Sequence, residues 1–267
     1  MKKLQDRVAI ITGAAMGMGF GCSKVLAAYG ANIVMIDIDP QVFREAEGLA
    51  QAGHQTSAYQ IDVRNAEDLK KTYDEVVEKY GKIDILINAA GVGMMEYFEK
   101  VDKDFFDKTF GINFKGIWNS CRAAISHMRK ANYGKIVNFA SVTGTMVVDP
   151  GMTTYGATKG AVLAFTKALA CEYAPFNVTV NAILPGFVDT PMVDKSCAEA
   201  CPEDPQSVKK AMAANIPMKR LGTIEEVGEV AAFLSSDESS YVTGTHIVFD
   251  GGSTLPESPG TGWQPGE

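Results

Sequence analysis

The sequence predicts an α/β fold in which helices cover both faces of a mostly parallel sheet. Short apolar, β-branched runs alternate with longer helical patterns, and a glycine-rich turn joins the first such run to the first helical pattern. Strands are expected near residues 7–12, 32–37, 56–61, 83–88, 134–140, 177–184 and 245–249. Helices are expected between them, notably near 102–130 and 153–173, and right-handed crossovers then produce a doubly wound sheet.

The first strand and the turn after it form a dinucleotide-binding pattern. Arg7 to Thr12 is a short apolar run typical of a buried parallel strand, and the glycine-rich turn from Gly13 to Gly19 follows it directly. Glycines let the backbone approach a pyrophosphate closely, and the next helix N-terminus offers unpaired N–H donors to phosphates. A purely structural turn is the alternative, but the place of the glycines between strand and helix favours a Rossmann-type cofactor site.

The second strand, Asn32 to Asp37, ends in a carboxylate. Asp37 lies 18 residues after Gly19, close to the ~20 residues expected for the acidic residue that binds the adenosine ribose. A carboxylate accepts hydrogen bonds from ribose hydroxyls and repels a 2′-phosphate, and no Arg or Lys occurs between Gly13 and Gly19. These residues predict NAD rather than NADP; the alternative is that Asp37 only caps the following helix.

Tyr155 and Lys159 stand four residues apart in a segment with helical character. That spacing places both side chains on one helix face. A phenol ordinarily ionises near pH ~10, and a neighbouring ammonium lowers that pKa toward the range needed to exchange a proton with an alcohol. In isolation such a pair is also typical of a solvated helix face, so its meaning depends on the rest of the chain.

Together these residues resemble the short-chain dehydrogenase/reductase family over roughly residues 4–255. The matching motifs are Thr12-Gly13 with Gly17 and Gly19, the run Asn88 to Gly91 (with Ala89 where Asn is commoner), the tetrad Asn113, Ser141, Tyr155 and Lys159, and the turn Pro185-Gly186. Three further stretches, Val142 to Pro150, Pro202 to Pro205 and Ser236 to Pro256, resemble one bacterial subgroup of single-domain, cytosolic members. Ser141 precedes Tyr155 by 14 residues, about one more than is typical of the family, which implies a slightly longer loop.

The resemblance implies an NAD-dependent oxidoreductase with seven strands in one domain. Tyr155 would exchange a proton with the substrate oxygen, Lys159 would lower the pKa of Tyr155 and hold the nicotinamide ribose, Ser141 would hydrogen-bond the substrate oxygen, and Asn113 would hold a water that links Lys159 to solvent. Expected cofactor contacts are Gly13, Met16, Gly17, Met18, Gly19, Asp37, Ile38, Asp62, Val63, Asn88, Ala89, Gly91, Tyr155, Lys159, Pro185, Gly186, Val188 and Thr190.

The substrate is expected to be a bulky, apolar secondary alcohol or ketone. Expected substrate contacts are Ser141, Met94, Met95, Val142, Val148, Met152, Tyr155 and Met192, and methionines adapt to irregular apolar shapes. A steroid or bile-acid hydroxyl is the leading hypothesis. Alternatives are a polyol, sugar or small-alcohol dehydrogenase, a 3-oxoacyl carrier-protein reductase, and a catalytically idle NAD-binding protein. Asp37 and the net charge of −7 disfavour the carrier-protein reductase, which usually pairs NADP with a basic docking patch.

Composition restricts the partners and the location. The chain has 267 residues, enough for one large domain, which we place at 1–255 with a lid at about 188–215 and an irregular tail at 256–267. Its 25 Lys and Arg against 32 Asp and Glu disfavour nucleic acid as a partner. The sequence contains neither an apolar run long enough to span a bilayer nor an N-terminal signal-peptide pattern, so we expect a cytoplasmic protein without a membrane partner.

Cysteines and histidines predict no metal site. The five cysteines are dispersed, and the three histidines stand in no zinc or nucleophile signature. A homotetramer is implied by the family resemblance, with contacts on the faces of the helices near 102–130 and 153–173.

Overall fold

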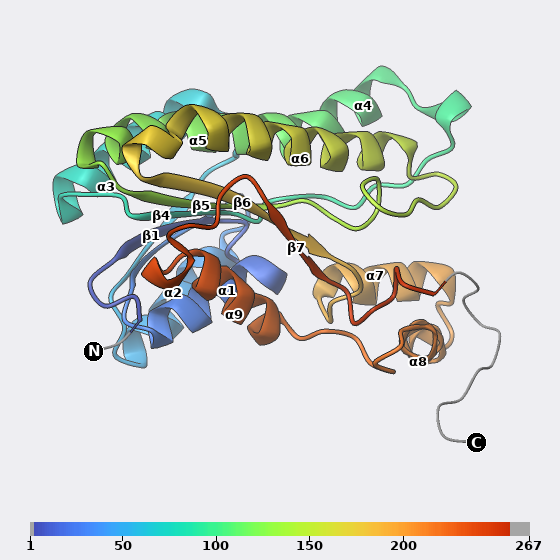
Figure 1. The fold of residues 1–267 in the computed structure, drawn as a ribbon. Coiled ribbons are helices and arrows are strands. Elements are labelled where there is room, and N and C mark those ends of the chain that lie inside the picture. The colour runs from blue at the N-terminus through green and yellow to red at the C-terminus, as the bar shows by residue number, and fades with distance from the viewer. Residues whose placement is uncertain (1–2, 257–267) are drawn as a thin grey trace.

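A computed structural model of the chain describes residues 3–256, which are built around one parallel sheet (Figure 1). Within these residues the seven strands are β1 (Val8–Thr12), β2 (Asn32–Asp37), β3 (Thr56–Gln60), β4 (Ile85–Asn88), β5 (Gly134–Phe139), β6 (Val178–Pro185) and β7 (His246–Phe249). Their order is β3-β2-β1-β4-β5-β6-β7, and each neighbouring pair is parallel. The predicted doubly wound, Rossmann-type α/β fold is confirmed.

Helices fill the connections between the strands. In the described part of the chain the α-helices are α1 (Gly17–Ala28), α2 (Gln41–Gln51), α3 (Ala66–Tyr80), α4 (Lys103–Phe110), α5 (Gly116–Ala131), α6 (Thr153–Tyr173), α7 (Pro191–Ala200), α8 (Pro205–Asn215) and α9 (Ile224–Leu234). Short helical turns are η1 (Phe98–Lys100), η2 (Gly111–Lys115), η3 (Ala174–Phe176) and η4 (Asp237–Ser239). Strand order reverses between β1 and β4, which is where ligands bind in sheets of this kind.

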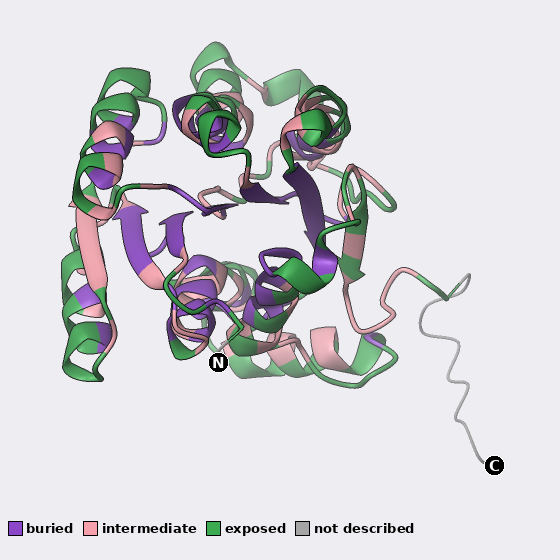
Figure 2. Ribbon diagram, turned by 60° about the vertical axis from the view of Figure 1, so that its left-hand side comes forward, coloured by how far each residue is buried: buried purple, intermediate pink, exposed green. Residues whose placement is uncertain are grey.

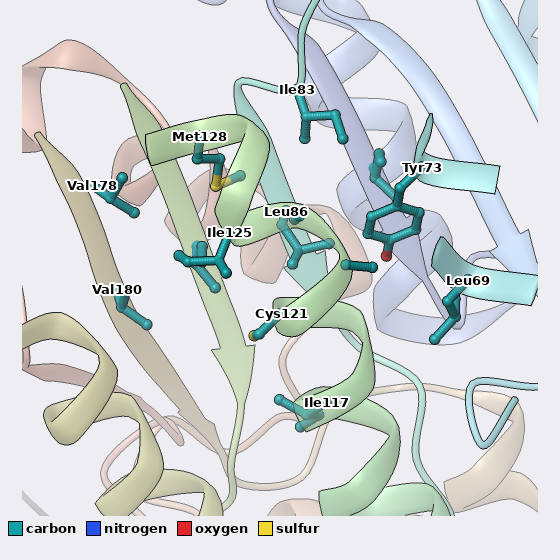
Figure 3. Packing of buried hydrophobic residues seen from close by; sticks show 14 of the residues in the cluster. Leu69, Tyr73, Ile83, Leu86, Ile117, Cys121, Ile125, Met128, Val178 and Val180 are labelled. Carbon is teal, nitrogen blue, oxygen red and sulfur yellow. The ribbon is translucent and has the colours of Figure 1, made fainter. Parts of the chain in front are cut away.

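The sheet is covered on both faces, so its central strands are buried throughout (Figures 1 and 2). In β1, Val8 and Ile10 join one apolar cluster with α3, α5 and α6, whereas Ala9 and Ile11 join the other with α1, α2 and α9. This alternation is the period of two expected of a strand. Figure 3 shows the first cluster, in which Tyr73 of α3 is fully buried. Its hydroxyl is hydrogen-bonded to Ser120 of α5. The two apolar clusters thus hold the sheet between two layers of helices, and the strand ends project from this packed core.

The helix predicted near 102–130 is present, but it is interrupted by a π-helical turn. The chain forms α4, then a π-helical turn at Gly111–Lys115, then α5. A Cβ atom built on Gly116 would lie 2.6 Å from Val63 Cγ2, so the helix approaches the β3–α3 connection more closely than a side chain would allow. Helical pattern in the sequence does not reveal such an insertion, because helical residues continue on both sides of it.

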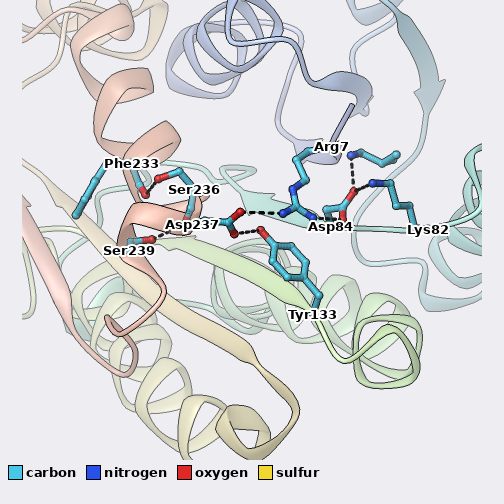
Figure 4. A network of polar contacts seen from close by, with 9 residues as sticks. Arg7, Lys82, Asp84, Tyr133, Phe233, Ser236, Asp237 and Ser239 are labelled. Atoms are coloured by element: carbon cyan, nitrogen blue, oxygen red, sulfur yellow. Dashed lines mark hydrogen bonds and ion pairs between the residues drawn. The ribbon is translucent and has the colours of Figure 1, made fainter. Parts of the chain in front are cut away.

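Asp84 is the centre of a polar network at the amino ends of the strands (Figure 4). The residue is 4% exposed, and its carboxylate accepts the Val8 N–H at 2.8 Å and pairs with Arg7 at 3.1 Å and Lys82 at 3.0 Å. Arg7 also forms an ion pair with Asp237, and Asp237 accepts a hydrogen bond from the Tyr133 hydroxyl at 2.8 Å. The network joins the starts of β1, β4 and β5 to η4, at the opposite end of the sheet from the motif-bearing strand ends.

Replacing Asp84 by Ala is expected to lower the free energy of unfolding by about 2–4 kcal/mol, because two cations and one backbone N–H lose a buried acceptor. Urea unfolding followed by circular dichroism measures the change. Asp74→Ala is the matched control: Asp74 pairs at the surface with Lys70 and His127, and its loss should cost less than about 1 kcal/mol. Equal small losses in both variants would contradict the role of Asp84.

Two sequence-based expectations concern segments at the margins of the fold. The expected lid, about 188–215, contains α7 and α8. Of the expected irregular tail, only Pro256 belongs to the described residues, and 257–267 lie outside them. Across residues 3–256 we find no helix whose length and apolarity would let it cross a bilayer.

Candidate functional site

A cleft made of two adjoining pockets lies at the carboxyl ends of the strands. The first, of about 330 Å³, is lined by the turn after β1, by Asp37 and Ile38 at the end of β2, by Asp62 and Val63 after β3, and by Ala89 and Gly91 after β4. The second, of about 120 Å³, is lined by Ser141, Tyr155, Lys159, Pro185, Gly186, Val188 and Thr190. Met18, Gly91 and Met192 line both, so the two pockets form one continuous site. We call them the Asp37 pocket and the Tyr155 pocket.

The glycine-rich turn is shaped by close backbone contacts. Gly13 has φ +70°, and a Cβ atom built on it would lie 2.6 Å from the Ala90 nitrogen. A Cβ atom on Gly19 would lie 2.0 Å from the Gly13 carbonyl oxygen. Helix α1 begins here with no side-chain cap and no acidic residue in its first turn. Its positive end and free N–H groups therefore face the Asp37 pocket, as a pyrophosphate requires.

Asp37 is held in place at the rim of the Asp37 pocket. Its Oδ2 accepts the N–H of Ala15, and its Oδ1 accepts the N–H of Asp39, both at 2.9 Å. The carboxylate therefore ties the glycine-rich turn to the end of β2 and keeps a negative charge in the pocket. Each oxygen retains a further lone pair that can accept a hydroxyl proton.

Asn113 occupies the π-helical turn and is fully buried. Its side-chain oxygen accepts the Val92 N–H at 2.8 Å, and its amide donates to the Val92 carbonyl at 2.9 Å. A Cβ atom built on Gly91 would lie 3.3 Å from Asn113 Oδ1 and 3.8 Å from Lys159 Nζ, so Gly91 lies between these two residues. Because the side-chain amide of Asn113 is already hydrogen-bonded to Val92, a water at this turn would have to bind to backbone groups.

Lys159 is buried against β5. Its Nζ donates to the carbonyl of Phe139 at 2.9 Å and lies 5.5 Å from the centre of the Tyr155 ring. Burial lowers the pKa of Lys159 from 10.5 to about 8, because the charged form loses its hydration. The lysine remains mostly protonated at neutral pH, at a position between the Tyr155 ring and the backbone of Phe139.

Tyr155 differs from its sequence-based expectation. We expected Lys159 to lower its pKa, but burial raises the pKa of Tyr155 above the ordinary value, and only a side-chain hydrogen bond with Ser141 opposes this. The physical reason is that the Tyr155 phenol is desolvated, which disfavours its charged form. Ser141 Oγ also accepts the Thr143 N–H at 3.1 Å, which orients the serine toward the same pocket.

Replacing Lys159 by Met is expected to raise the free energy of unfolding at pH 7 by about 1–3 kcal/mol, because it removes a buried charge. The pKa of Lys159 is lower in the folded state (about 8) than the 10.5 of the exposed group. Between those values the unfolded state binds more protons, so the stability of the unaltered protein rises with pH and the advantage of the variant shrinks. Urea unfolding at pH 7, 8.5 and 9.5 checks this; a constant difference across that range would contradict the shifted pKa.

Most of the predicted site residues meet in the cleft. The lining of the two pockets includes Gly13, Met16, Gly17, Met18, Gly19, Asp37, Ile38, Asp62, Val63, Ala89, Gly91, Ser141, Tyr155, Lys159, Pro185, Gly186, Val188, Thr190 and Met192. Asn88 is an exception: its side chain is buried and donates to Asn138 and Cys121, away from the cleft. It lies on the α5 side of the sheet because it belongs to β4, where side chains alternate between faces.

Most of the apolar residues predicted to contact substrate lie outside the two pockets. Val142 is buried in the apolar cluster beneath α5 and α6, so its side chain faces the core. Met94 is turned toward Thr109 of α4. Met95 and Val148 are exposed on the loops after β4 and β5, and Met152 precedes α6, outside both pocket linings. Of the apolar residues predicted to contact substrate, only Met192 lines the Tyr155 pocket in this structure.

Sequence reasoning missed several lining residues. Arg64, which pairs with Asp62, and Ile112 line the Asp37 pocket, while Phe139 and Val193 line the Tyr155 pocket. Arg64 directly follows the predicted Asp62-Val63 position, so extending that motif by one residue would have included it. Ile112 belongs to the π-helical turn and carried no signal in the sequence. Among residues 3–256 no group of His, Cys, Asp and Glu side chains is arranged to hold a metal ion.

Comparisons with known proteins agree with this geometry. A family model of short-chain dehydrogenases, described as "Enoyl-(Acyl carrier protein) reductase", matches residues 13–254. Oxidoreductase UcpA of Escherichia coli (strain K12) is 47% identical, over 98% of this chain and 100% of its own. NAD-dependent glycerol dehydrogenase of Listeria innocua is 36% identical, over 94% of this chain and 95% of its own. The crystal structure of levodione reductase superposes with a TM-score of 0.89 at 30% identity, covering 94% of this chain and 98% of that one.

Proposed function

The chain belongs to the short-chain dehydrogenase/reductase family, and from that membership we propose that it is an NAD(H)-dependent oxidoreductase that interconverts a secondary alcohol and a ketone. The likeness to the UcpA-like bacterial subgroup, predicted from three stretches of the sequence, is confirmed by full-length identity. One observation carries the proposal. Ser141, Tyr155 and Lys159 line a pocket continuous with the one that holds the glycine-rich turn and Asp37.

The Asp37 pocket fits a dinucleotide. The uncapped end of α1 and the closely packed Gly13 and Gly19 would receive the pyrophosphate. Asp37 would accept the adenosine ribose hydroxyls, and its negative charge favours NAD over NADP. Asp62 and Val63 would border the adenine, and Lys159 would bond the nicotinamide ribose. When bound, the nicotinamide supplies the site that accepts or donates hydride.

The chain's own residues would move the proton. In oxidation Tyr155 would take the proton of the substrate hydroxyl, and in reduction it would return a proton to the carbonyl oxygen. Ser141 would hydrogen-bond the same substrate oxygen. The Lys159 ammonium would stabilise the Tyr155 phenolate, and a water held at the Asn113 turn would connect Lys159 to solvent. Because burial raises the pKa of Tyr155, this stabilisation is required for the phenol to act near neutral pH.

The Tyr155 pocket supports an apolar substrate. Besides the catalytic side chains and Thr190, its lining includes Val92, Val188, Met192 and Val193, whose side chains cannot hydrogen-bond a second hydroxyl. A steroid or bile-acid hydroxyl therefore stays our leading substrate class. A carrier-protein reductase, the activity for which the matching family is described, is disfavoured by Asp37 and by the net charge of −7.

We also propose that residues 1–255 form one catalytic domain and that the protein works as a cytoplasmic homotetramer. Exposed aromatic side chains on the expected contact helices support assembly: Trp118 of α5 packs beside Phe165 of α6, with ring centres 5.2 Å apart, and remains 46% exposed. Sedimentation analysis of the purified chain checks the assembly.

The deciding experiment is NADH formation at 340 nm across steroids, bile acids, polyols and small secondary alcohols, repeated with NADP. Turnover of a steroid-type alcohol with NAD supports both cofactor and substrate. Activity confined to polyols keeps the mechanism and rejects the apolar substrate. No turnover of any alcohol, together with NADH binding, would favour an idle binding protein.

A further inference from the structure

Helices α7 and α8 form a pair that is attached to the rest of the fold by few apolar contacts. Figure 1 shows them beyond the strand ends, apart from the helices that cover the sheet, and their main packing partner is each other. Within them only Cys197 is buried, and α8 has no buried residue. Segments held by so little apolar surface have low local stability, so polar contacts weigh more in setting their position.

The first turn of α7 contacts both walls of the cleft. Thr190, the N-cap of α7, accepts the Val193 N–H, and its methyl carbon would lie 3.6 Å from a Cβ atom built on Gly17. Met192 Sδ would lie 3.0 Å from a Cβ atom built on Gly93. The position of this turn therefore sets the width of the cleft between the glycine-rich turn and the loop after β4.

Lys209 of α8 joins the two ends of that first turn. Its Nζ lies 2.6 Å from Asp189 Oδ1 and 2.8 Å from Asp194 Oδ1, so one ammonium bonds the residue before the Thr190 cap and a residue in the turn after it. The Lys209 side chain is only 20% exposed, although both carboxylates are more than half exposed. We call these three residues the Lys209 cluster.

We propose that Lys209 is a positioning residue: through Asp189 and Asp194 it holds the first turn of α7 against the cleft and thereby sets the affinity for the cofactor. This inference rests on the proposed function and adds to it a residue that touches neither cofactor nor substrate. Without the ammonium, two neighbouring carboxylates repel each other at the start of α7, and the turn opens more often. Cofactor binding then requires the turn to close first, which weakens the apparent affinity.

The first test uses the cofactor-free protein. In Lys209→Met, backbone amides in the first two turns of α7 should exchange hydrogen roughly three- to tenfold faster than in the unaltered protein. Lys209→Arg keeps the charge and should restore much of the protection. Lys195→Met is the matched control, because Lys195 also lies on α7 but pairs at the surface with Glu199 of the same helix. Unchanged exchange in Lys209→Met overturns the inference.

The second test is the Kd of NADH, measured by fluorescence titration. Lys209→Met should raise it about three- to tenfold, Lys209→Arg by less, and Lys195→Met should leave it unchanged. Faster exchange with an unaltered Kd overturns the link to the cofactor. If the unaltered protein binds no NADH, the proposed function fails together with that link. If the unaltered protein binds NADH but amide exchange is unchanged in Lys209→Met, only the role of Lys209 is overturned and the proposed function stands.

Discussion

Replacing Tyr155 by Phe will lower kcat by roughly 10²–10⁴-fold, the usual contribution of a positioned acid or base. The substitution removes one hydroxyl and keeps the ring, which lies beside Lys159. Lys159 and the Asp37 pocket are left in place, so the Kd of NADH should change by less than about threefold. Steady-state assays with the best alcohol from the panel, together with NADH fluorescence titration, measure both quantities.

Tyr241→Phe is the matched control for this experiment. Tyr241 is fully exposed, so loss of its hydroxyl should leave both kcat and the Kd of NADH unchanged. A Tyr155→Phe enzyme that keeps more than a tenth of its activity would sink the assignment of Tyr155 as the proton-exchanging group. Loss of NADH binding in that variant would show that the hydroxyl, and not only the ring, is needed to hold the cofactor.

Replacing Asp37 by Asn will lower the preference for NAD over NADP, expressed as a ratio of kcat/KM values, by about 10–10²-fold. The substitution removes the charge that would repel a 2′-phosphate while retaining one side-chain oxygen. That oxygen can still accept the N–H of Ala15 or Asp39, so the glycine-rich turn keeps part of its support. Initial rates with both cofactors measure the ratio.

Asp39→Asn tests whether the discrimination belongs to Asp37 alone. Asp39 lines the same pocket, but its Oδ1 accepts the N–H of Gln41 at 2.8 Å at the start of α2. We expect this variant to change the ratio by less than about threefold. A large effect of Asp39→Asn beside a small effect of Asp37→Asn would move the discriminating charge to Asp39.

Local pattern was enough to predict the sheet, because its signal lies within each segment. The apolar run of β1 and the expected helix 153–173 have the periods of buried strand and helix, and the structure forms both, the helix with the expected ends. The same reasoning placed Asp37, Ser141 and Pro185 at strand ends, and parallel strands bring those ends to one edge. Pocket-lining side chains from distant parts of the sequence were therefore predictable as a group.

Individual side-chain directions were less predictable. Asn88 and Val142 stand in or beside the predicted motifs, yet both face the core, because alternation along a strand and the path of the loop after β5 decide the direction. The π-helical turn at Asn113 depends on contacts with Val92 and on the close approach of Gly116 to Val63. Neither contact partner is near in sequence, so periodicity could not reveal the insertion.

The sequence by itself predicted the fold class and the glycine-rich turn, since these follow from short-range periodicity and glycine positions, while Ser141 and Lys159 beside Tyr155 were predicted from the motifs of the family resemblance. Tertiary structure alone decided the electrostatics and the contacts that join α7 to α8. Burial of Tyr155 and Lys159 sets the direction of both pKa shifts, and both residues belong to α6, which packs against β5 and β6. The Lys209 cluster joins α8 to residues 15 and 20 positions earlier, a contact made by folding the chain back between two helices.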